Sequence, residues 1–159
     1  MAYQKLQVGL GVNVIPSDTI NIPNVAGPTQ SGTVTSVVAN ELNDSARTLT
    51  TGGFTNALVG YIVYNNETNA IATVTSVTSV NKLVLSADIM LVDSESYTLY
   101  ADDNAGCVLY VGEPGDLRVL TSSGSDITFT GVLAGSFIPV QVKRVFDTST
   151  GASSILALW

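Results

Sequence analysis

The side chains that could carry chemistry in this chain are acids and hydroxyls, because histidine is absent from its 159 residues. Histidine is the commonest general base and the commonest neutral metal ligand. Ser, Thr and Asp are plentiful, but a nucleophile needs an adjacent base, and the sequence contains no nucleophile-elbow motif. The 13 Asp and Glu residues are scattered through predicted turns, where solvation explains them better than paired catalytic carboxylates. We therefore expect no catalytic residues and no enzymatic activity.

Two acidic groups offer the hard oxygen ligands that calcium prefers: Asp102-Asp103-Asn104, and Asp93 with Glu95. Their spacing does not match an EF-hand loop, which alternates over a longer stretch and is closed by a glutamate. Asx side chains form turns with the same residues. We expect turns at both places, with no bound metal and no cofactor.

Cys107 is the single cysteine, so an intrachain disulfide is impossible and folding in a reducing cytosol is compatible with the sequence. Its neighbours Val108 and Leu109 indicate a small buried hydrophobic residue. The N-terminal MAYQKLQVGLG lacks the apolar core of a signal peptide, and no apolar run approaches the length of a membrane span. We expect a protein made in the cytoplasm that makes no membrane contact.

The net charge of −7 disfavours nucleic acid as a partner, because phosphate binding needs clustered Lys and Arg. Only Lys143-Arg144 places two cations together. Adjacent strand residues point to opposite faces unless a bulge intervenes. Either one of these cations faces another sheet or a neighbouring subunit, where it needs a carboxylate partner, or the strand is an edge guarded by charge and Pro139.

The elements that must position these side chains are strands. Charged residues make up 12% of the chain and hydrophobic residues 45%, and short β-branched runs alternate with Gly, Asn, Asp and Ser. Only Asn40–Leu49 offers a possible helix, and it is rich in residues that prefer caps and turns. Strands are predicted at Gln7–Val14, Thr19–Ile22, Thr33–Val38, Tyr61–Tyr64, Ala70–Val77, Lys82–Leu85, Ser96–Tyr100, Val108–Val111, Leu117–Thr121, Ile127–Thr130, Phe137–Lys143 and Ser154–Trp159.

With no helices to cover a parallel sheet, these strands predict an all-β fold, an antiparallel β-sandwich or barrel. Turn-forming residues cluster at Asn24–Gly32 and Ala101–Gly106, which indicates two crossings between modules. We expect residues 1–32 and 101–159 to form one domain, interrupted by an inserted small β-barrel at residues 33–100.

The inserted segment contains five aromatic residues that could line a carbohydrate-binding face. Tyr61 and Tyr64 fall on opposite faces of one predicted strand, so at least one of them is expected to pack in the core. The five aromatic residues are Phe54, Tyr61, Tyr64, Tyr97 and Tyr100.

Several short motifs keep their order at the two ends of the chain: Ser17-Asp18-Thr19, Leu109-Tyr110-Val111-Gly112, Gly115-Asp116, Pro139-Val140 and Leu158-Trp159. In this pattern the chain closely resembles the head spike base family of tailed bacteriophages and gene transfer agents. Members of that family run from a PSDT segment through LYVG, GD and RV segments to a strand with the pattern G-(S/T)-x-x-P-V-x-V-x-R-V, and end in an apolar run closed by an aromatic residue. The resemblance covers about half the chain, and residues 33–100 stand between its two parts.

The resemblance implies a jelly-roll-like sandwich on the outer surface of a capsid, as a decoration or head-vertex spike base protein. Its implied partners are the major capsid protein, further copies of itself as a trimer or pentamer, and a spike or fibre protein. Two alternatives remain open: a tail, baseplate or fibre-associated protein whose insert binds a host-surface glycan, and a glycan hydrolase with paired carboxylates.

We select candidate interface residues by size and motif position, and all of them belong to the predicted sandwich domain. Trp159 is expected to be substantially buried, either within the subunit or against a neighbour, because an apolar C-terminal run must be kept from water. The candidates are Arg118, Phe137, Pro139, Arg144, Phe146 and Trp159.

Overall fold

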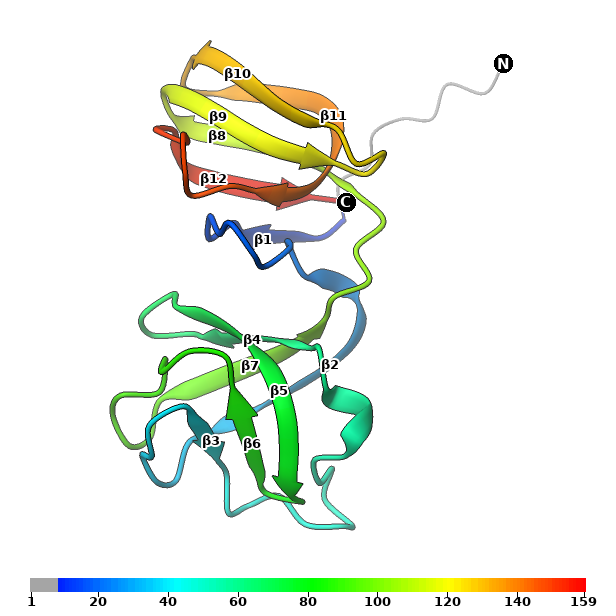
Figure 1. Cartoon of the computed structure of the whole chain (residues 1–159), viewed down its shortest axis with the longest axis vertical. Helices are drawn as coiled ribbons and strands as arrows, with labels where there is room; N and C mark the ends of the chain where they lie inside the picture. The colour runs from blue at the N-terminus through cyan, green and yellow to red at the C-terminus, as the bar shows by residue number, and fades with distance from the viewer. Residues whose placement is uncertain (1–8) are drawn as a thin grey trace. The chain divides into compact units, whose positions relative to one another are not determined.

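The computed structural model describes residues 9–159, which divide into two compact units. One unit, here called the split unit, comprises the chain up to Ala26 together with Asn104–Trp159. The other, the insert unit, is Gly27–Asp103. Among the described residues, every regular element except the 3-10 helix η1 (Asn56–Leu58) is a strand (Figure 1). The strands pair antiparallel, which confirms the all-β antiparallel fold class.

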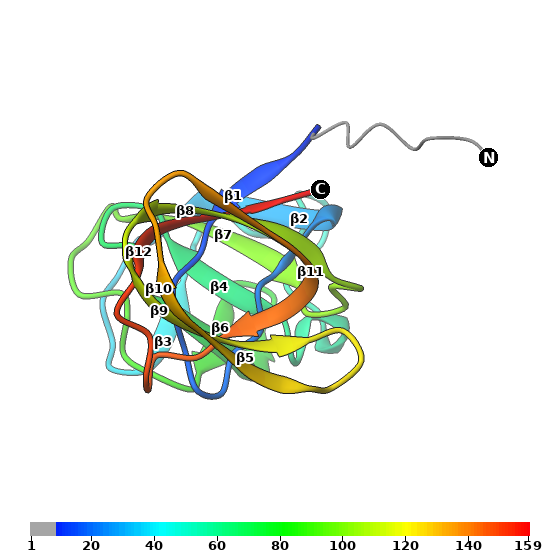
Figure 2. The ribbon, with the colours of Figure 1, turned by 90° about the horizontal axis from the view of Figure 1, so that it is seen from above.

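The split unit is built on one six-stranded sheet with the order β1-β12-β8-β11-β9-β10. The strand β11 bends this sheet, because its first residues pair with β8 and its last residues pair with β9. Seen from above, the strands curl around an interior (Figure 2). The strands are β1 (Gly11–Asn13), β8 (Cys107–Glu113), β9 (Gly115–Thr121), β10 (Asp126–Val132), β11 (Ser136–Val145) and β12 (Ser153–Leu158).

The hairpin between β9 and β10 turns through a left-handed glycine. Gly124 has a φ of +87° and its N–H donates to the carbonyl of Thr121 at 3.0 Å. The N–H of Thr121 in turn donates to the carbonyl of Ser125 at 2.9 Å. This is the pattern of a type I turn followed by a glycine bulge, which fixes the register of the two strands.

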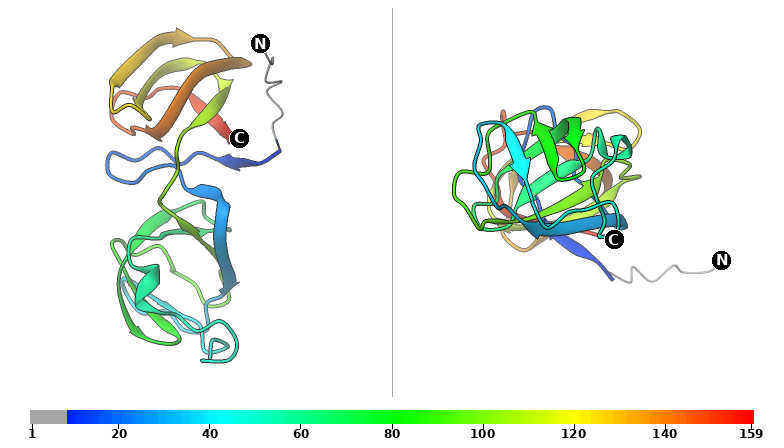
Figure 3. Two further views of the ribbon diagram at one scale, coloured as in Figure 1. Left: turned by 90° about the vertical axis from the view of Figure 1, so that its right-hand side faces the viewer. Right: turned by 90° about the horizontal axis from the view of Figure 1, so that it is seen from below.

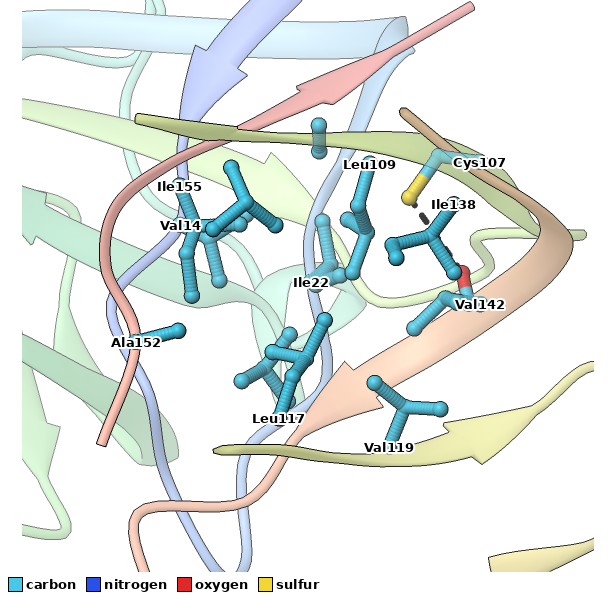
Figure 4. Close-up of a cluster of buried hydrophobic side chains, with 13 residues drawn as sticks. Val14, Ile22, Cys107, Leu109, Leu117, Val119, Ile138, Val142, Ala152 and Ile155 are labelled. Carbon is cyan, nitrogen blue, oxygen red and sulfur yellow. Dashed lines mark hydrogen bonds between the residues drawn. The ribbon is translucent and has the colours of Figure 1, made fainter. Parts of the chain in front are cut away.

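The core of the split unit contains side chains from both sides of the insert (Figure 4). Leu109, Leu117 and Val142 come from β8, β9 and β11, whereas Val14 and Ile22 come from the segment that follows β1. Backbone hydrogen bonds anchor that segment: the Val14 N–H donates to Ile155 at 2.9 Å and the Ile22 N–H to Lys143 at 2.8 Å. Burying one such aliphatic side chain contributes about 1.5–3 kcal/mol, so the early segment is part of the fold and not a tail.

The insert unit has its own six-stranded sheet, with the order β2-β7-β4-β5-β6-β3 (Figure 3). It also has its own buried core. Its core is centred on large side chains that are fully buried, among them Leu42, Leu83, Met90, Tyr97 and Leu99. The strands are β2 (Asn24–Thr33), β3 (Glu41–Asn43), β4 (Ile62–Asn65), β5 (Ile71–Ser79), β6 (Lys82–Leu85) and β7 (Ser96–Ala101).

The sequence predicted a small β-barrel in the insert, and the structure shows no closed barrel there. Within residues 9–159 its sheet ends at β2 on one side and at β3 on the other. The segment that follows β2 meets β3 through one isolated bridge, between Ser36 and Asn43. Beside it, the Thr35 N–H donates to the Asn43 carbonyl at 2.8 Å. The ladder stops there because β3 is only three residues long.

The first predicted strands are misplaced. Asn24–Gly32, predicted as a crossing, belongs to β2, and the chain leaves strand geometry over most of the predicted strand Thr33–Val38. Pro28 and Gly27 misled the prediction, but an edge strand tolerates proline because one side of it needs no N–H donor. Thr19–Ile22 is also not a strand, because the Ser17 hydroxyl accepts from the N–H groups of Thr19 and Ile20 and bends the chain.

Three further sequence expectations differ from the structure in element type or in boundaries. Asn40–Leu49, the one possible helix, contains the strand β3 followed by turns. The predicted strand Gln7–Val14 corresponds to β1 at Gly11–Asn13, and its first two residues lie outside the described part of the chain. The insert unit, Gly27–Asp103, is wider on both sides than the predicted inserted domain 33–100, since β2 pairs with β7.

Candidate interaction surface

An apolar row crosses the face of the split unit's sheet that points away from its core. Phe137, Tyr110 and Leu156 are direct cross-strand neighbours on β11, β8 and β12. Their sequence neighbours Ile138, Leu109 and Ile155 are buried in the core, so these three side chains point outward. We call Phe137, Tyr110 and Leu156 the outer row.

Phe137 is the most prominent member of the outer row, since 56% of its surface is exposed. Its ring meets that of Tyr110 edge-on, with the centroids 5.3 Å apart and the planes at 61°. Aromatic pairs of this geometry present a large rigid surface that loses little conformational entropy on binding. Pro139 lies two residues further along β11 and is also exposed. The predicted interface residues Phe137 and Pro139 therefore lie on one surface, and the sequence prediction missed Tyr110 and Leu156.

A second cluster joins the first motif of the chain to the last part of β11. The Asp18 carboxylate accepts from the N–H of Thr148 at 3.0 Å and from its hydroxyl at 2.7 Å. Arg144 donates to the carbonyl of Asp18 at 2.9 Å and to the side-chain oxygen of Asn21 at 3.0 Å. We call these contacts the clasp. They hold the early segment against β11, and the acceptors of Arg144 are a carbonyl and a side-chain amide, not the carboxylate that one of the two sequence alternatives required.

Arg118 and Phe146 extend the clasp on the same side of the sheet. The Arg118 guanidinium lies over the Phe146 ring at 4.4 Å from its centroid, and Arg144 lies at 5.8 Å from the same centroid. Arg118 also makes a bidentate pair with Asp126, at 3.0 and 2.7 Å. Mutual hydrogen bonding raises the pKa of Arg118 and lowers that of Asp126. The structure thus brings together three predicted interface residues, Arg118, Arg144 and Phe146. The two guanidinium groups, however, already have hydrogen-bond partners within the same chain.

Lys143 and Arg144 are separated by an irregularity in the sheet. The register between β11 and β9 shifts between Val142 and Arg144, which is the bulge that the sequence argument named as one possibility. Through this shift Arg144 reaches the clasp, and the carbonyl of Lys143 accepts from Ile22. Both cations are half-buried.

Trp159 is half-buried and packs against the core of the split unit. Its indole N–H donates to the side-chain oxygen of Asn104 at 3.3 Å, and its backbone exchanges hydrogen bonds with Gly9 and Leu10. Trp159 therefore serves the interior of its own unit more than a partner.

The insert unit contains a polar network that the sequence argument missed. The Asp44 carboxylate is buried and accepts from Tyr97 at 2.6 Å and from Arg47 at 3.1 Å. Arg47 also donates to the carbonyls of Gly52, at 3.2 Å, and of Ser31. The spacing D-x-x-R in Asn43–Arg47 was the available signal, because it lets the two side chains meet across one turn.

This network keeps Tyr97 and Arg47 protonated. Burial raises the pKa of Tyr97, and the hydrogen bond to Asp44 raises it further, so the phenol stays protonated and donates. Burial lowers the pKa of Arg47, but Tyr97 and Asp44 more than offset this, and the net shift is upward. A hollow of about 420 Å³ opens beside the network, lined by Ser31, Gly32, Thr33, Thr35, Asp44, Ala46, Arg47 and Thr51.

The aromatic residues of the insert do not form a flat binding face. Phe54, Tyr64 and Tyr97 are buried, and Tyr61 packs against the same core. Tyr100 is half-buried and meets Tyr64 edge-on at 5.4 Å. A sugar platform needs ring faces open to solvent, which these side chains do not provide.

The two acidic groups that we considered as calcium ligands, Asp102-Asp103-Asn104 and Asp93 with Glu95, lie in turns, bends and irregular segments of the chain. The Glu95 carboxylate is buried and accepts from the N–H groups of Leu91 and Val92, at 2.8 and 3.2 Å. The side-chain oxygen of Asn104 accepts from Gly106 at 2.9 Å. Within residues 9–159, no three His, Cys, Asp or Glu side chains are grouped as a metal site requires. In the same range, the structure has no helix of the length and apolar character needed to span a membrane.

Cys107 lies in the core of the split unit, and its thiol donates to the carbonyl of Val142 at 3.3 Å (Figure 4). Burial raises the pKa of this thiol to about 12, so it stays protonated at neutral pH. A buried protonated thiol is a poor nucleophile.

Comparisons with known proteins return no match: no family model, no curated protein and no solved structure is similar to this chain.

Proposed function

We propose that this chain is a structural protein of a tailed-bacteriophage or gene-transfer-agent particle, a capsid decoration or head-vertex spike base protein. It binds the outer surface of the major capsid protein and associates with further copies of itself. The role is mechanical and needs no cofactor, and the protein assembles in the cytoplasm of the host. The motif resemblance described above is what suggests this class.

The observation that carries the proposal is the outer row. A sheet face that is not packed on its own core is normally polar, whereas this one presents Phe137 at 56% exposure against Tyr110, with Leu156 beside them. Exposed aromatic side chains held rigidly on strands are typical of interface anchors. With charged residues only 12% of the chain, the rest of the surface is largely neutral and polar. Such a surface suits a subunit of a stable assembly.

The motif residues support the same proposal in another way. Asp18, Arg144 and Thr148 lie in or beside the motifs of the resemblance, and they join segments more than 120 residues apart in sequence. These motifs therefore act as structural contacts of the split unit. The clasp uses the end of β11 that pairs with β9, whereas the outer row lies where β11 pairs with β8. The outer row is therefore the surface that we assign to the capsid.

The test is binding of the full chain to empty capsids assembled from the major capsid protein of the same genome. Co-sedimentation is expected for the native chain. The substitution Phe137→Ala should weaken binding at least about tenfold, as loss of a central aromatic anchor does. Leu133→Ala is the matched control, because Leu133 is 72% exposed but lies in the turn after β10, outside the outer row. Absence of binding by the native chain contradicts the proposal.

The copy number in purified particles locates the protein. Hundreds of copies indicate the capsid faces, about sixty or fewer indicate the vertices, and a handful indicates the tail, because each site repeats with the symmetry of the shell. Quantitative mass spectrometry against the major capsid protein gives this ratio.

A further inference from the structure

The strand β10 is an edge of the split unit's sheet that lacks the usual protection. It is last in the strand order, and its residues DITFTGV contain neither Lys nor Pro. Its single charge, Asp126, is already paired with Arg118. The register shift on β10 lies beyond Phe129, so the first half of the strand keeps regular pairing. Long regular edges without charge or proline are prone to pair with another strand. By contrast, the edge strand β2 of the insert carries Pro28, and the edge strand β1 has three residues.

The backbone of β10 offers its unpaired groups at alternate residues. The N–H of Thr121 donates to the carbonyl of Ser125, which makes that facing pair a hydrogen-bonded one. Hydrogen-bonded and non-bonded pairs alternate along an antiparallel ladder. Ile127 opposite Val119 and Phe129 opposite Leu117 are therefore bonded to β9. It follows that the N–H and C=O groups of Asp126, Thr128 and Thr130 point to the open side.

The core is also incompletely covered at this edge. Ile127 and Phe129 stand opposite Val119 and Leu117, both fully buried, so their side chains are on the core face of the sheet. Phe129 packs against the core but is only half-buried, and Ile127 is 38% exposed. One more strand beside β10 would both pair the free backbone groups and cover these two side chains.

We propose that this added strand is β10 of a second copy of the chain, paired antiparallel about a two-fold axis at Thr128. In this register Thr128 faces its own counterpart and Asp126 faces Thr130 of the second copy. All three residues that point their backbone groups outward are then in hydrogen-bonded pairs. Ile127 faces Phe129 of the second copy as a non-bonded pair, in which side chains approach most closely, on the core face.

The charge pattern favours a second copy over an unrelated strand. Self-association of a chain with net charge −7 brings like charges together unless the contact itself is nearly neutral. The β10 edge meets this condition, because its one carboxylate faces a threonine in the proposed register and already has Arg118 as a partner. The same residues on both sides also satisfy the self-complementarity that a two-fold interface demands.

The first test is the mass of the full chain in solution, compared with Thr128→Pro. The native chain of 16.5 kDa should approach twice that mass as its concentration rises, because edge pairing alone is a small interface. Thr128→Pro removes the central N–H of the contact, and that N–H has no partner within the sheet. The variant should remain monomeric with an unchanged thermal midpoint. Thr128→Val is the matched control, since it keeps the N–H and should still dimerise.

The second test reads the register and does not depend on proline being tolerated. Hydrogen-bonded strand partners have Cα atoms about 5.5 Å apart, within the range that a disulfide spans. Under mild oxidation Thr128→Cys should form a covalent dimer on the order of ten times faster than Ser123→Cys, in the exposed β9–β10 turn. The native Cys107 is buried and does not compete.

Two results overturn the proposal: a native chain that stays monomeric at every concentration, or equal rates of cross-linking for the two cysteine variants. Neither bears on the capsid-binding test, which uses the outer row on β8, β11 and β12. Capsid binding and β10 pairing can therefore fail separately.

Discussion

Asp18 shows how one side chain can hold a segment that has no regular structure. Its carboxylate accepts two hydrogen bonds from Thr148, one from the hydroxyl and one from the backbone N–H. Both bonds lower the pKa of the Asp18 carboxyl group below its ordinary value of 3.8, and the bond from the hydroxyl has the larger effect. The ionised form is the one that accepts both bonds, so folding and ionisation favour each other. Val14 and Ile22 reach the core on either side of this contact.

Acid should loosen the clasp in a defined direction. A carboxylate whose pKa is lower in the folded state adds stability above its unfolded pKa and loses it as the pH falls through the folded pKa. The thermal midpoint of the native chain should therefore exceed that of Asp18→Asn near pH 6, and the difference should shrink below pH 3.8. Calorimetric or fluorescence melts of both proteins across this range measure it.

The control for acid loosening is Glu113→Gln, which removes an exposed carboxylate at the end of β8. It changes the net charge equally but touches no part of the clasp. A difference between the native chain and Asp18→Asn that stays constant from pH 6 to pH 2.5 or so would show that the carboxylate contributes nothing by ionising.

At the scale of elements, β2 ends against the polar network of the insert. Gly32 is the point of contact, because a Cβ placed there would lie 2.4 Å from a carboxylate oxygen of Asp44 and 2.6 Å from the Tyr97 hydroxyl. Neither atom can move freely, since Tyr97 is fully buried and both atoms are hydrogen-bonded. A glycine is required here by the close approach of β2 to the network.

Gly32→Ala should therefore destabilise the insert unit by about 1–3 kcal/mol, the usual range for overpacking a filled site. Urea unfolding followed by tyrosine fluorescence measures the change. Gly9→Ala is the matched control, because a Cβ at Gly9 meets no atom within 4 Å. Equal midpoints for the two variants would mean that β2 shifts away from the network at no cost.

The strands that could be predicted from sequence are those with strict alternation. β9 and β12 alternate between buried and more exposed residues over most of their length, β8 does so in its second half, and the predicted bounds of all three lie within two residues of the observed ones. The prediction failed where tertiary contacts decide. Nothing local marks Asn24–Thr33 as a strand, because its partner β7 lies some seventy residues later.

The same limit applies to the candidate surface. Phe137 could be selected from its size and motif, but Tyr110 joins it only through the register of β11 on β8. Arg144 was selected as an interface residue for its size and motif position, yet its guanidinium donates to Asp18 and Asn21, more than 120 positions away. Pairing of this kind depends on the register of distant strands, which composition and periodicity do not specify.

For the whole molecule, the two units differ in how they are assembled from the chain. All the core residues of the insert unit lie between Val34 and Leu99, within one continuous segment. The core of the split unit needs Val14 and Ile22 from one side of the insert and residues 107–157 from the other. We therefore expect the insert unit to fold when it is separated from the rest of the chain, and the split unit not to fold without both of its segments.

Residues 27–103 expressed by themselves should fold, with a cooperative thermal transition and dispersed amide resonances in a proton–nitrogen NMR spectrum. The matched comparison is residues 104–159, which have five of the six strands of their sheet but lack Val14 and Ile22. Losing two buried aliphatic side chains removes about 3–6 kcal/mol, comparable to the net stability of a small domain. The second fragment should be largely unfolded, and a stably folded one would contradict this account.

The interrupted core of the split unit also sets an order of events during translation. The insert unit is complete once Asp103 has left the ribosome, whereas Val14 and Ile22 wait, uncovered, until β12 has been made. For the time needed to synthesise some fifty further residues, the nascent chain carries a folded module preceded by an unsatisfied apolar segment. The pairing of β12 with β8 therefore completes the core of the split unit only after the insert unit can already have folded.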